Sequence, residues 1–316
     1  MNELNKTYAS NLEKVLYHTE HLNDIKNLSM MRPITVDLNP SGYCNGGCRF
    51  CTQVNMPRVN IDYDLACKGL RMYKEAGAVG LELTGGGEPL MHPRINELIS
   101  YAESVGYAIG MITNGTLIDE RLRIDAMQKL TWLRVSLNPI YHKGLSFPVK
   151  PIVHYDGTYG ANFVWEEGMN EDTLKWVFDA VKNGGFEYVK ITPDVLSNEA
   201  GNMITWLEEK LRNTDYPVFA GGRTIMNTNT IPTDCFAGYL KPHINQDGKI
   251  YRCSCASWEL KKYPKYAMIA DLNDKNFEVP IIYDNFNTSQ CTVCHYEDLN
   301  NLIKMLLSEP KHQEFI

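Results

Sequence analysis

The chain has 316 residues, of which 44% are hydrophobic and 22% are charged, and these proportions exclude a disordered or low-complexity protein. Its formal net charge is −7, from 31 basic and 38 acidic residues without a lysine or arginine run, which argues against a nucleic-acid partner. Because no stretch of 18 apolar residues and no signal-like start occurs, we expect a cytoplasmic protein without a membrane segment.

Strand-like and helix-like patterns alternate from residue 33 onward. Strands are predicted at 33–39, 79–84, 107–113, 132–138, 160–166 and 186–193. Helices are predicted at about 63–76 and 93–106, and further helical stretches separate the later strands. This alternation predicts an α/β fold with a parallel sheet, in which chemistry gathers at the carboxyl ends of the strands.

The chain is predicted to have three parts. Residues 1–32 are polar and amphipathic and are expected to form a helical extension, ahead of the α/β domain at 33–220. The pattern turns irregular after about residue 214, and a second, smaller domain is placed at 221–316. The stretch LKPHINQDGKIYRCSC predicts a hairpin there, because Asp247-Gly248 suits a turn between two alternating runs.

Nine cysteines occur, at positions 44, 48, 51, 67, 235, 253, 255, 291 and 294. In a cytosolic chain, clustered cysteines are more often metal ligands than disulfides, whereas the lone Cys67 suits a buried position on a helix. The segment SGYCNGGCRFC carries Cys44, Cys48 and Cys51. A structural metal ion takes four protein ligands, so three imply an open position. Three thiolates can hold three irons of a [4Fe-4S] cluster and leave the fourth iron free.

The pattern Cys44-x3-Cys48-x2-Cys51, with Phe50 before the last cysteine, resembles the cluster motif of the radical SAM superfamily. The sequence Gly86-Gly87-Glu88-Pro89 follows the second predicted strand, as the GGEP motif of that superfamily does. The resemblance implies a partial (β/α)6 barrel over residues 33–220 and a [4Fe-4S] cluster with S-adenosylmethionine (SAM) as cofactors. A zinc knuckle is the alternative for the cysteines, and a tight βα turn is the alternative for the glycines.

The resemblance also implies which residues contact SAM. Phe50 lies in the cluster motif, and Gly86, Gly87 and Glu88 would receive the amino group of SAM. Ser136, in LRVSLN, stands where relatives place a polar contact to the ribose and carboxylate, with Asn138 as the alternative. ITNGT (112–116) is similar to the third-strand ending of the family, although Thr113 and Asn114 can also cap the following helix.

A second cysteine pattern lies near the carboxyl terminus. Cys235-x12-Gly248-x4-Cys253, followed by Cys291-x2-Cys294, resembles the twitch domain, a shortened SPASM domain with one auxiliary [4Fe-4S] cluster. We therefore expect two clusters, the second saturated by four cysteines. Cys255 is surplus and could replace Cys253 or remain a free thiol. Structural zinc is the alternative for this domain.

The segment 138–160 departs from the expected pattern, because a long loop is predicted where a helix would ordinarily fit. Loops of this length are often functional. Six of its side chains are candidate substrate contacts: Tyr141, His142, Lys143, His154, Tyr155 and Asp156. The alternative is a solvated crossover with a few packed aromatic rings.

The resemblance implies that a reduced cluster, supplied with electrons by a flavodoxin or ferredoxin, splits SAM into methionine and a 5′-deoxyadenosyl radical, which abstracts a hydrogen atom. A net two-electron oxidation of a small molecule is the leading expectation, with the auxiliary cluster as electron acceptor. The first alternative is a maturase of peptide or protein side chains, although only 32 residues precede the first predicted strand. The second alternative is a zinc-stabilised interaction protein.

Overall fold

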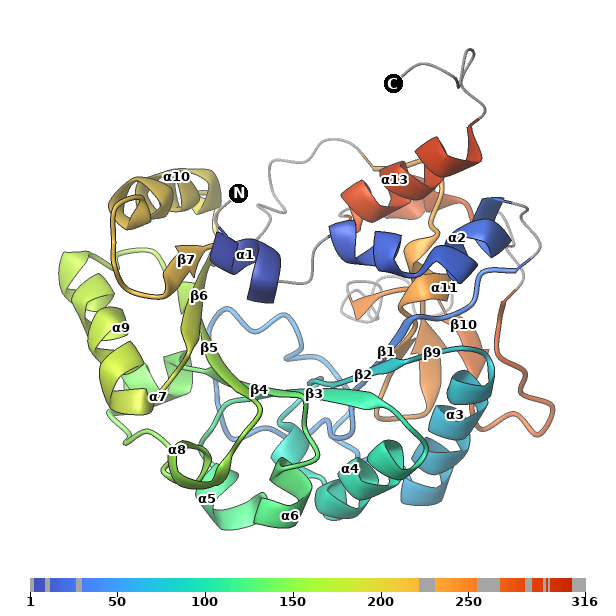
Figure 1. Cartoon of the computed structure of the whole chain (residues 1–316), viewed down its shortest axis with the longest axis horizontal. Coiled ribbons are helices and arrows are strands. Elements are labelled where there is room, and N and C mark those ends of the chain that lie inside the picture. Colours follow the sequence, from blue (N-terminus) through green and yellow to red (C-terminus); the bar gives the residue numbers. More distant parts are fainter. Residues whose placement is uncertain are drawn as a thin grey trace.

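The computed structural model describes residues 3–8, 12–26, 30–221, 231–254, 268–281, 286–291, 294 and 296–308. Its strands form one sheet in the order β10-β9-β8-β1-β2-β3-β4-β5-β6-β7. The sheet curves like part of a barrel wall (Figure 1). Within the described ranges, every helix is too short or too polar to cross a lipid bilayer.

Seven consecutive strands run parallel and form the barrel wall. They are β1 (Thr35–Leu38), β2 (Gly80–Leu83), β3 (Ala108–Thr113), β4 (Trp132–Ser136), β5 (Thr158–Trp165), β6 (Tyr188–Pro193) and β7 (Val218–Ala220). The six predicted strands and the predicted α/β class are confirmed. The seventh strand was not predicted, since three residues between turn-like segments give no measurable alternation.

Helices cover the convex side of the wall (Figure 1). They are α3 (Tyr63–Glu75), α4 (Ile95–Ser104), α5 (Ile118–Arg121), α6 (Ile124–Met127), α7 (Asn138–Lys143), α8 (Lys150–His154), α9 (Glu171–Gly184) and α10 (Ala200–Leu211). Helix α3 begins where Asp62 accepts a hydrogen bond from the Leu65 amide at 2.9 Å. Its buried residues include Leu70, which joins Leu81 and Leu83 of β2 in one core. That packing orients the opposite face of each strand toward the barrel interior.

The prediction of a long loop at 138–160 was wrong, because α7 and α8 lie within it. Pro139 and Pro151 interrupt the sequence pattern, and they read as helix breakers. Both stand in the first turn of their helix, where the missing amide hydrogen costs nothing.

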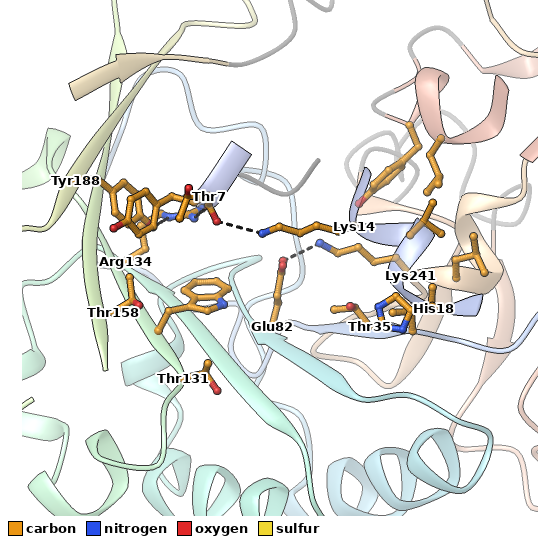
Figure 2. A pocket seen from close by; sticks show the side chains of 17 residues that line it. Thr7, Lys14, His18, Thr35, Glu82, Thr131, Arg134, Thr158, Tyr188 and Lys241 are labelled. Carbon is orange, nitrogen blue, oxygen red and sulfur yellow. Dashed lines mark hydrogen bonds and ion pairs between the residues drawn. The ribbon is translucent and has the colours of Figure 1, made fainter. Parts of the chain in front are cut away.

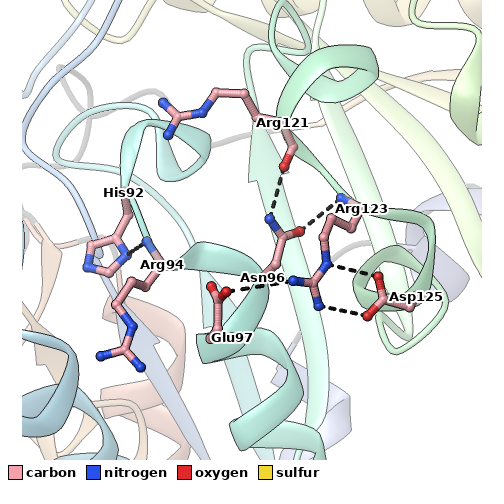
Figure 3. A network of polar contacts seen from close by, with 7 residues as sticks. All are labelled: His92, Arg94, Asn96, Glu97, Arg121, Arg123 and Asp125. Carbon is pink, nitrogen blue, oxygen red and sulfur yellow. Dashed lines mark hydrogen bonds and ion pairs between the residues drawn. The ribbon is translucent and has the colours of Figure 1, made fainter.

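Side chains link the loops that connect the strands with their covering helices (Figure 3). Asn96 of α4 donates to the Arg121 carbonyl at 3.0 Å and accepts from the Arg123 amide at 2.9 Å. His92, which follows the short helix η2 (Pro89–Met91), hydrogen bonds the Ile61 carbonyl at 2.9 Å. These bonds hold the connections after β1, β2 and β3 in fixed positions.

The carboxyl-terminal part extends the same sheet. It contains α11 (Ala237–Leu240), β8 (His243–Ile244), β9 (Lys249–Tyr251), β10 (Met268–Asp271), η5 (Thr288–Gln290) and α13 (Glu297–Leu307). The predicted hairpin is confirmed: β8 and β9 pair antiparallel across a turn that ends at Gly248, with φ +82°. Strand β8 also pairs parallel with β1. The domain boundary at 220/221 stays a prediction, since one sheet includes strands from both sides of it.

The amino-terminal segment packs against both parts. It forms α1 (Glu3–Tyr8), η1 (Leu12–Tyr17) and α2 (Thr19–Lys26). The Tyr8 ring stacks on Tyr188 of β6 with 4.2 Å between centroids. Val15 and Ile25 share a separate small core with Ile303 of α13. The segment therefore lies beside the amino-terminal end of the barrel interior and closes part of it.

Candidate functional site

Three loops meet at the carboxyl end of the sheet. The cysteine loop follows β1, the glycine-rich loop follows β2, and residues 114–116 follow β3. The Glu88 amide donates to the Tyr43 carbonyl at 2.7 Å, and the Asn114 side chain donates to Asn45 Oδ1 at 2.7 Å. Asn45 in turn donates to Thr116 Oγ1 at 2.8 Å. The loops therefore hold one another, as expected where parallel strands end together.

The first cysteine group is brought together by its loop. A Cβ atom added to Gly46 would lie 3.4 Å from Cys44 Sγ and 3.6 Å from Cys48 Sγ. Burial, then the neighbouring Cys51 and Cys44 thiols, raises the pKa of Cys48 to about 11. Three crowded thiols resist joint ionisation until a cation neutralises them. The group thus suits a metal centre that thiolates can hold.

Among the described residues, no three His, Cys, Asp or Glu side chains are placed as ligands of a single metal ion would be. Phe50 is half-buried in the cysteine loop.

The glycines of the second loop are required by close approaches. A Cβ on Gly87 would lie 2.2 Å from the Tyr43 carbonyl oxygen, and one on Gly86 would lie 2.8 Å from Gln246 Oε1. At Gly87 the backbone of the cysteine loop would have to shift to make room, and at Gly86 the Gln246 side chain would have to move. Gly86 and Gly87 therefore bring the glycine-rich loop against the cysteine loop and the β8–β9 hairpin. This role of the two glycines is structural, and their contact with SAM stays a prediction.

Glu88 is buried and hydrogen-bonded to the neighbouring loops. The side chain is 2% exposed, and its carboxylate accepts from Thr113 Oγ1 at 2.6 Å, the Asn114 amide at 2.7 Å and the Leu90 amide at 3.1 Å. Burial raises its pKa, and these hydrogen bonds oppose that rise. Both oxygens thus accept hydrogen bonds from the protein, so Glu88 connects the loops after β2 and β3, while its contact with the amino group of SAM stays a prediction.

The variant Glu88→Gln separates positioning from direct contact. A glutamine amide group facing the Asn114 amide would place donor against donor, so we expect the free energy of unfolding to fall by about 1–3 kcal/mol, together with weaker SAM binding. Urea unfolding and equilibrium dialysis with SAM measure the two effects. Glu97→Gln, on the exposed side of α4, is the control. Weaker SAM binding at unchanged stability would instead indicate the direct contact predicted from the sequence.

The two predicted cofactor contacts at the carboxyl end of β4 differ in how fully their polar atoms are already hydrogen-bonded. Asn138 is fully buried, and its amide pairs with both the carbonyl and the amide of Val164, each at 2.7 Å. It therefore joins the ends of β4 and β5. Ser136 is half-buried on the interior face, 3.3 Å from Asn162 Oδ1. Of the two, Ser136 is the residue that remains able to contact a bound cofactor.

The six candidate substrate contacts fall at opposite ends of the sheet. Those on α7 lie at the carboxyl end, where Lys143 Nζ donates to the Asn45 carbonyl at 2.7 Å and His142 Nε2 lies 2.5 Å from Glu166 Oε1. Tyr141 instead packs into the core, with its hydroxyl 3.3 Å from Thr173 Oγ1. His154, Tyr155 and Asp156 precede β5, at the amino end. They do not join the cysteine loop.

Two residues of the site were missed in the sequence. Glu166 follows β5 directly, and its charge raises the pKa of Cys48. Lys190 lies on β6 between Val189 and Ile191, both fully buried in the core that packs against the helices, so its side chain lies on the interior face. Its register partner on β5 is Asn162, which pairs with Ser136. The alternation in YVKIT was the available signal for Lys190.

The amine of Lys190 has an unusual environment. Burial, then the neighbouring Arg134 guanidinium, lowers its pKa to about 8. Between about pH 8 and its ordinary pKa of 10.5, the unfolded chain holds this proton and the folded chain releases it. The destabilisation from the buried charge is therefore complete below pH 8 and disappears as the pH rises toward 10.5.

We expect Lys190→Met to be more stable than the parent at pH 7, by on the order of 2 kcal/mol, and to lose that advantage near pH 10. Denaturant unfolding across this range measures the difference between the two proteins. Lys175→Met, at an exposed position of α9, is the matched control and should show no such trend. A pH-independent difference for Lys190→Met would contradict the lowered pKa.

Cysteines of the second group also lie close together. Burial raises the pKa of Cys235 to about 12, and the nearby Cys253 and Cys294 thiols add to that rise. Asn300 of α13 lies 3.6 Å from Cys294 Sγ and accepts from the Phe236 amide at 2.8 Å. Cys291 is half-buried directly after η5. Cys255 lies outside the described residues.

Comparison with known proteins decides the family. A family model described as the radical SAM superfamily matches residues 38–199, just over half of the chain, including the cysteine loop and Glu88. The chain belongs to the radical SAM superfamily. Membership implies a [4Fe-4S] cluster and SAM, and the three thiols of the first loop fit the cluster. It also removes the alternative of a zinc-stabilised interaction protein.

Two curated relatives match locally. A tungsten-containing aldehyde ferredoxin oxidoreductase cofactor-modifying protein of Pyrococcus furiosus is 34% identical over 84 residues, 25% of this chain and 24% of the relative. The S-adenosylmethionine-dependent nucleotide dehydratase RSAD2 of Danio rerio is 30% identical over 93 residues, 28% of this chain and 26% of the relative. The matched segments thus span about a quarter of each relative.

A solved protein structure shares the fold. SuiB of Streptococcus suis, in complex with the precursor peptide SuiA, superposes with a TM-score of 0.56 at 18% identity. The similarity covers 79% of this chain and 66% of SuiB, just under two thirds. At this identity it supports the architecture alone.

Proposed function

We propose that this radical SAM enzyme catalyses a net two-electron oxidation of a small molecule, and that Cys235, Cys253, Cys291 and Cys294 hold an auxiliary [4Fe-4S] cluster in a twitch domain. One observation carries the proposal. The thiols of Cys253 and Cys294 lie close enough to Cys235 to raise the pKa of its thiol, beside a hairpin that continues the barrel sheet. A redox group held there would share a rigid framework with the radical site.

When bound at Cys44, Cys48 and Cys51, a [4Fe-4S] cluster reduced by a flavodoxin or ferredoxin supplies the electron that divides SAM into methionine and a 5′-deoxyadenosyl radical. The protein orients and shields this chemistry. Gly86 and Gly87 allow the glycine-rich loop to approach the cysteine loop, and Glu88 joins the glycine-rich loop to the end of β3 by its three hydrogen bonds.

The oxidation balances if the substrate loses one hydrogen atom, one electron and one proton in total. The hydrogen atom would be recovered in 5′-deoxyadenosine. An auxiliary cluster held by Cys235, Cys253, Cys291 and Cys294 would supply the electron acceptor, since four cysteines would leave no iron open to substrate. Lys190 is a suitable acceptor for the proton, because an amine with a pKa of about 8 is partly neutral near physiological pH.

A small substrate is favoured by the space inside the barrel. The interior cavity has a volume of about 530 Å³, which lies in the range typical of small-molecule sites. SuiB, by contrast, has been solved with a precursor peptide, so modification of a peptide or protein side chain remains the alternative function.

Hydrogen abstraction from deuterated material distinguishes these two functions. Host cells grown in heavy water would supply a small-molecule fraction and a peptide and protein fraction, each to be incubated with reconstituted enzyme, SAM and dithionite. We expect deuterium to enter 5′-deoxyadenosine only with the small-molecule fraction, as measured by mass spectrometry. Deuterium transfer from the peptide fraction alone would replace the proposed function with a maturase.

A further inference from the structure

The interior cavity opens beside the amino-terminal segment, at the opposite end of the strands from the cysteine loop. Lys14 enters it from η1, Glu82 from β2, Arg134 from β4, and Lys241 from the turn before β8 (Figure 2). Tyr188, whose ring is stacked on Tyr8, forms part of the wall. The cavity therefore combines aromatic surface with several charges.

One of these charges is already neutralised. Lys241 Nζ lies 2.8 Å from Glu82 Oε2 and 3.3 Å from Asp37 Oδ1. The two carboxylates hold the pKa of Lys241 well above its ordinary value, against the effect of burial. A buried cation with two close carboxylates needs no further partner.

Lys14 and Arg134 are in the opposite situation. Lys14 donates to the Thr7 carbonyl at 3.4 Å, and Arg134 donates to the Tyr188 hydroxyl at 2.9 Å and the Tyr8 carbonyl at 3.0 Å. These acceptors are neutral. Among the described side chains, no carboxylate comes within 4.0 Å of either cation. Burial first, and then Arg134, lowers the pKa of Lys14, with Glu82 in opposition.

Two cations that face the same concavity attract an anion, because partial burial strengthens their field relative to open water. We propose that the cavity holds the substrate by an anionic group, a carboxylate or a phosphate, bound between Lys14 and Arg134. This substrate class rests on the radical oxidation proposed above.

The position of Arg134 makes the proposal compatible with the radical site. Ser136 lies two residues farther along β4 on the same face, roughly 7 Å toward the carboxyl end. Asn162 and Lys190 occupy the register positions beside Ser136 on β5 and β6. A small molecule anchored at Arg134 would therefore extend its other end toward Ser136 and Lys190, where the cofactor loops meet the barrel.

Site-resolved labelling of lysines tests anion binding without any radical chemistry. The full chain would be methylated with formaldehyde and borohydride in sodium phosphate, sodium acetate or sodium chloride at equal pH and ionic strength. Labelling of Lys14 and of the exposed Lys175 would be followed by peptide mass spectrometry. Phosphate or acetate should slow labelling of Lys14 by about threefold at twice its dissociation constant, because protection follows mass action.

The phosphate and acetate arms distinguish a phosphorylated substrate from a carboxylic acid. Arg134→Gln should abolish the protection of Lys14, and Arg134→Lys, which keeps the positive charge, should retain part of it. Equal labelling of Lys14 in all three salts, or equal protection of Lys175, would overturn the proposal. Failure of the radical oxidation would be seen separately, as absence of SAM cleavage, because the labelling needs neither cluster.

Discussion

Anaerobically reconstituted protein with Cys44, Cys48 and Cys51 all replaced by alanine is expected to retain about four of about eight irons and to lose all cleavage of SAM. The three side chains stand in one loop after β1, and the thiols of Cys44 and Cys51 raise the pKa of Cys48. Removing them leaves SAM without an iron to bind. Iron and sulfide analysis measures the first effect, and chromatography of 5′-deoxyadenosine measures the second.

Cys67→Ala is the matched control for this variant. Cys67 is half-buried on α3 and packs against the main core, so its loss should change neither iron content nor cleavage. Unchanged SAM cleavage by the triple variant would refute the assignment of the first cysteine group. Zinc in place of iron at the second group would refute the auxiliary cluster while leaving the first assignment intact.

Replacing both Cys291 and Cys294 with alanine is expected to remove the other half of the iron while 5′-deoxyadenosine is still formed from SAM and dithionite. The oxidised product should be absent, because the substrate radical has no electron acceptor. Cys255→Ala is the control, and it should keep about eight irons if Cys253 is the fourth ligand.

Two results would contradict this view of the second cysteine group. Product formation by the double variant would exclude an electron-accepting role. Loss of cooperative unfolding together with the iron would make the group structural, since small metal-bound regions often depend on their metal to fold. Circular dichroism during thermal unfolding measures the cooperativity.

The barrel strands could be predicted because each contributes one face to the helix-packed core and the other to the interior. Leu133 and Val135 of β4 are fully buried, whereas Arg134 between them is half-buried. That alternation of buried and half-buried residues can be recognised in the local sequence. Strand β8, with two residues, is too short to carry such a pattern, and its pairing with β1 joins segments about two hundred residues apart.

The candidate site was predictable only where its pattern is local. The cysteine loop and the glycine-rich loop each lie within one short segment, so spacing revealed them. The hydrogen bonds of Glu88 could not be predicted, because Thr113 and Asn114, which donate to its carboxylate, lie at the end of the next strand. Lys14 and Arg134 lie 120 positions apart, and only the fold places both in one cavity.

Reductive cleavage of SAM by the unaltered protein tests whether the chain acts as a radical SAM enzyme. Reconstituted enzyme would be mixed anaerobically with SAM and dithionite, and both products would be quantified by mass spectrometry. We expect 5′-deoxyadenosine and methionine in equal amounts, with no cleavage when the clusters are omitted. Intact SAM after incubation with iron-loaded protein would contradict it.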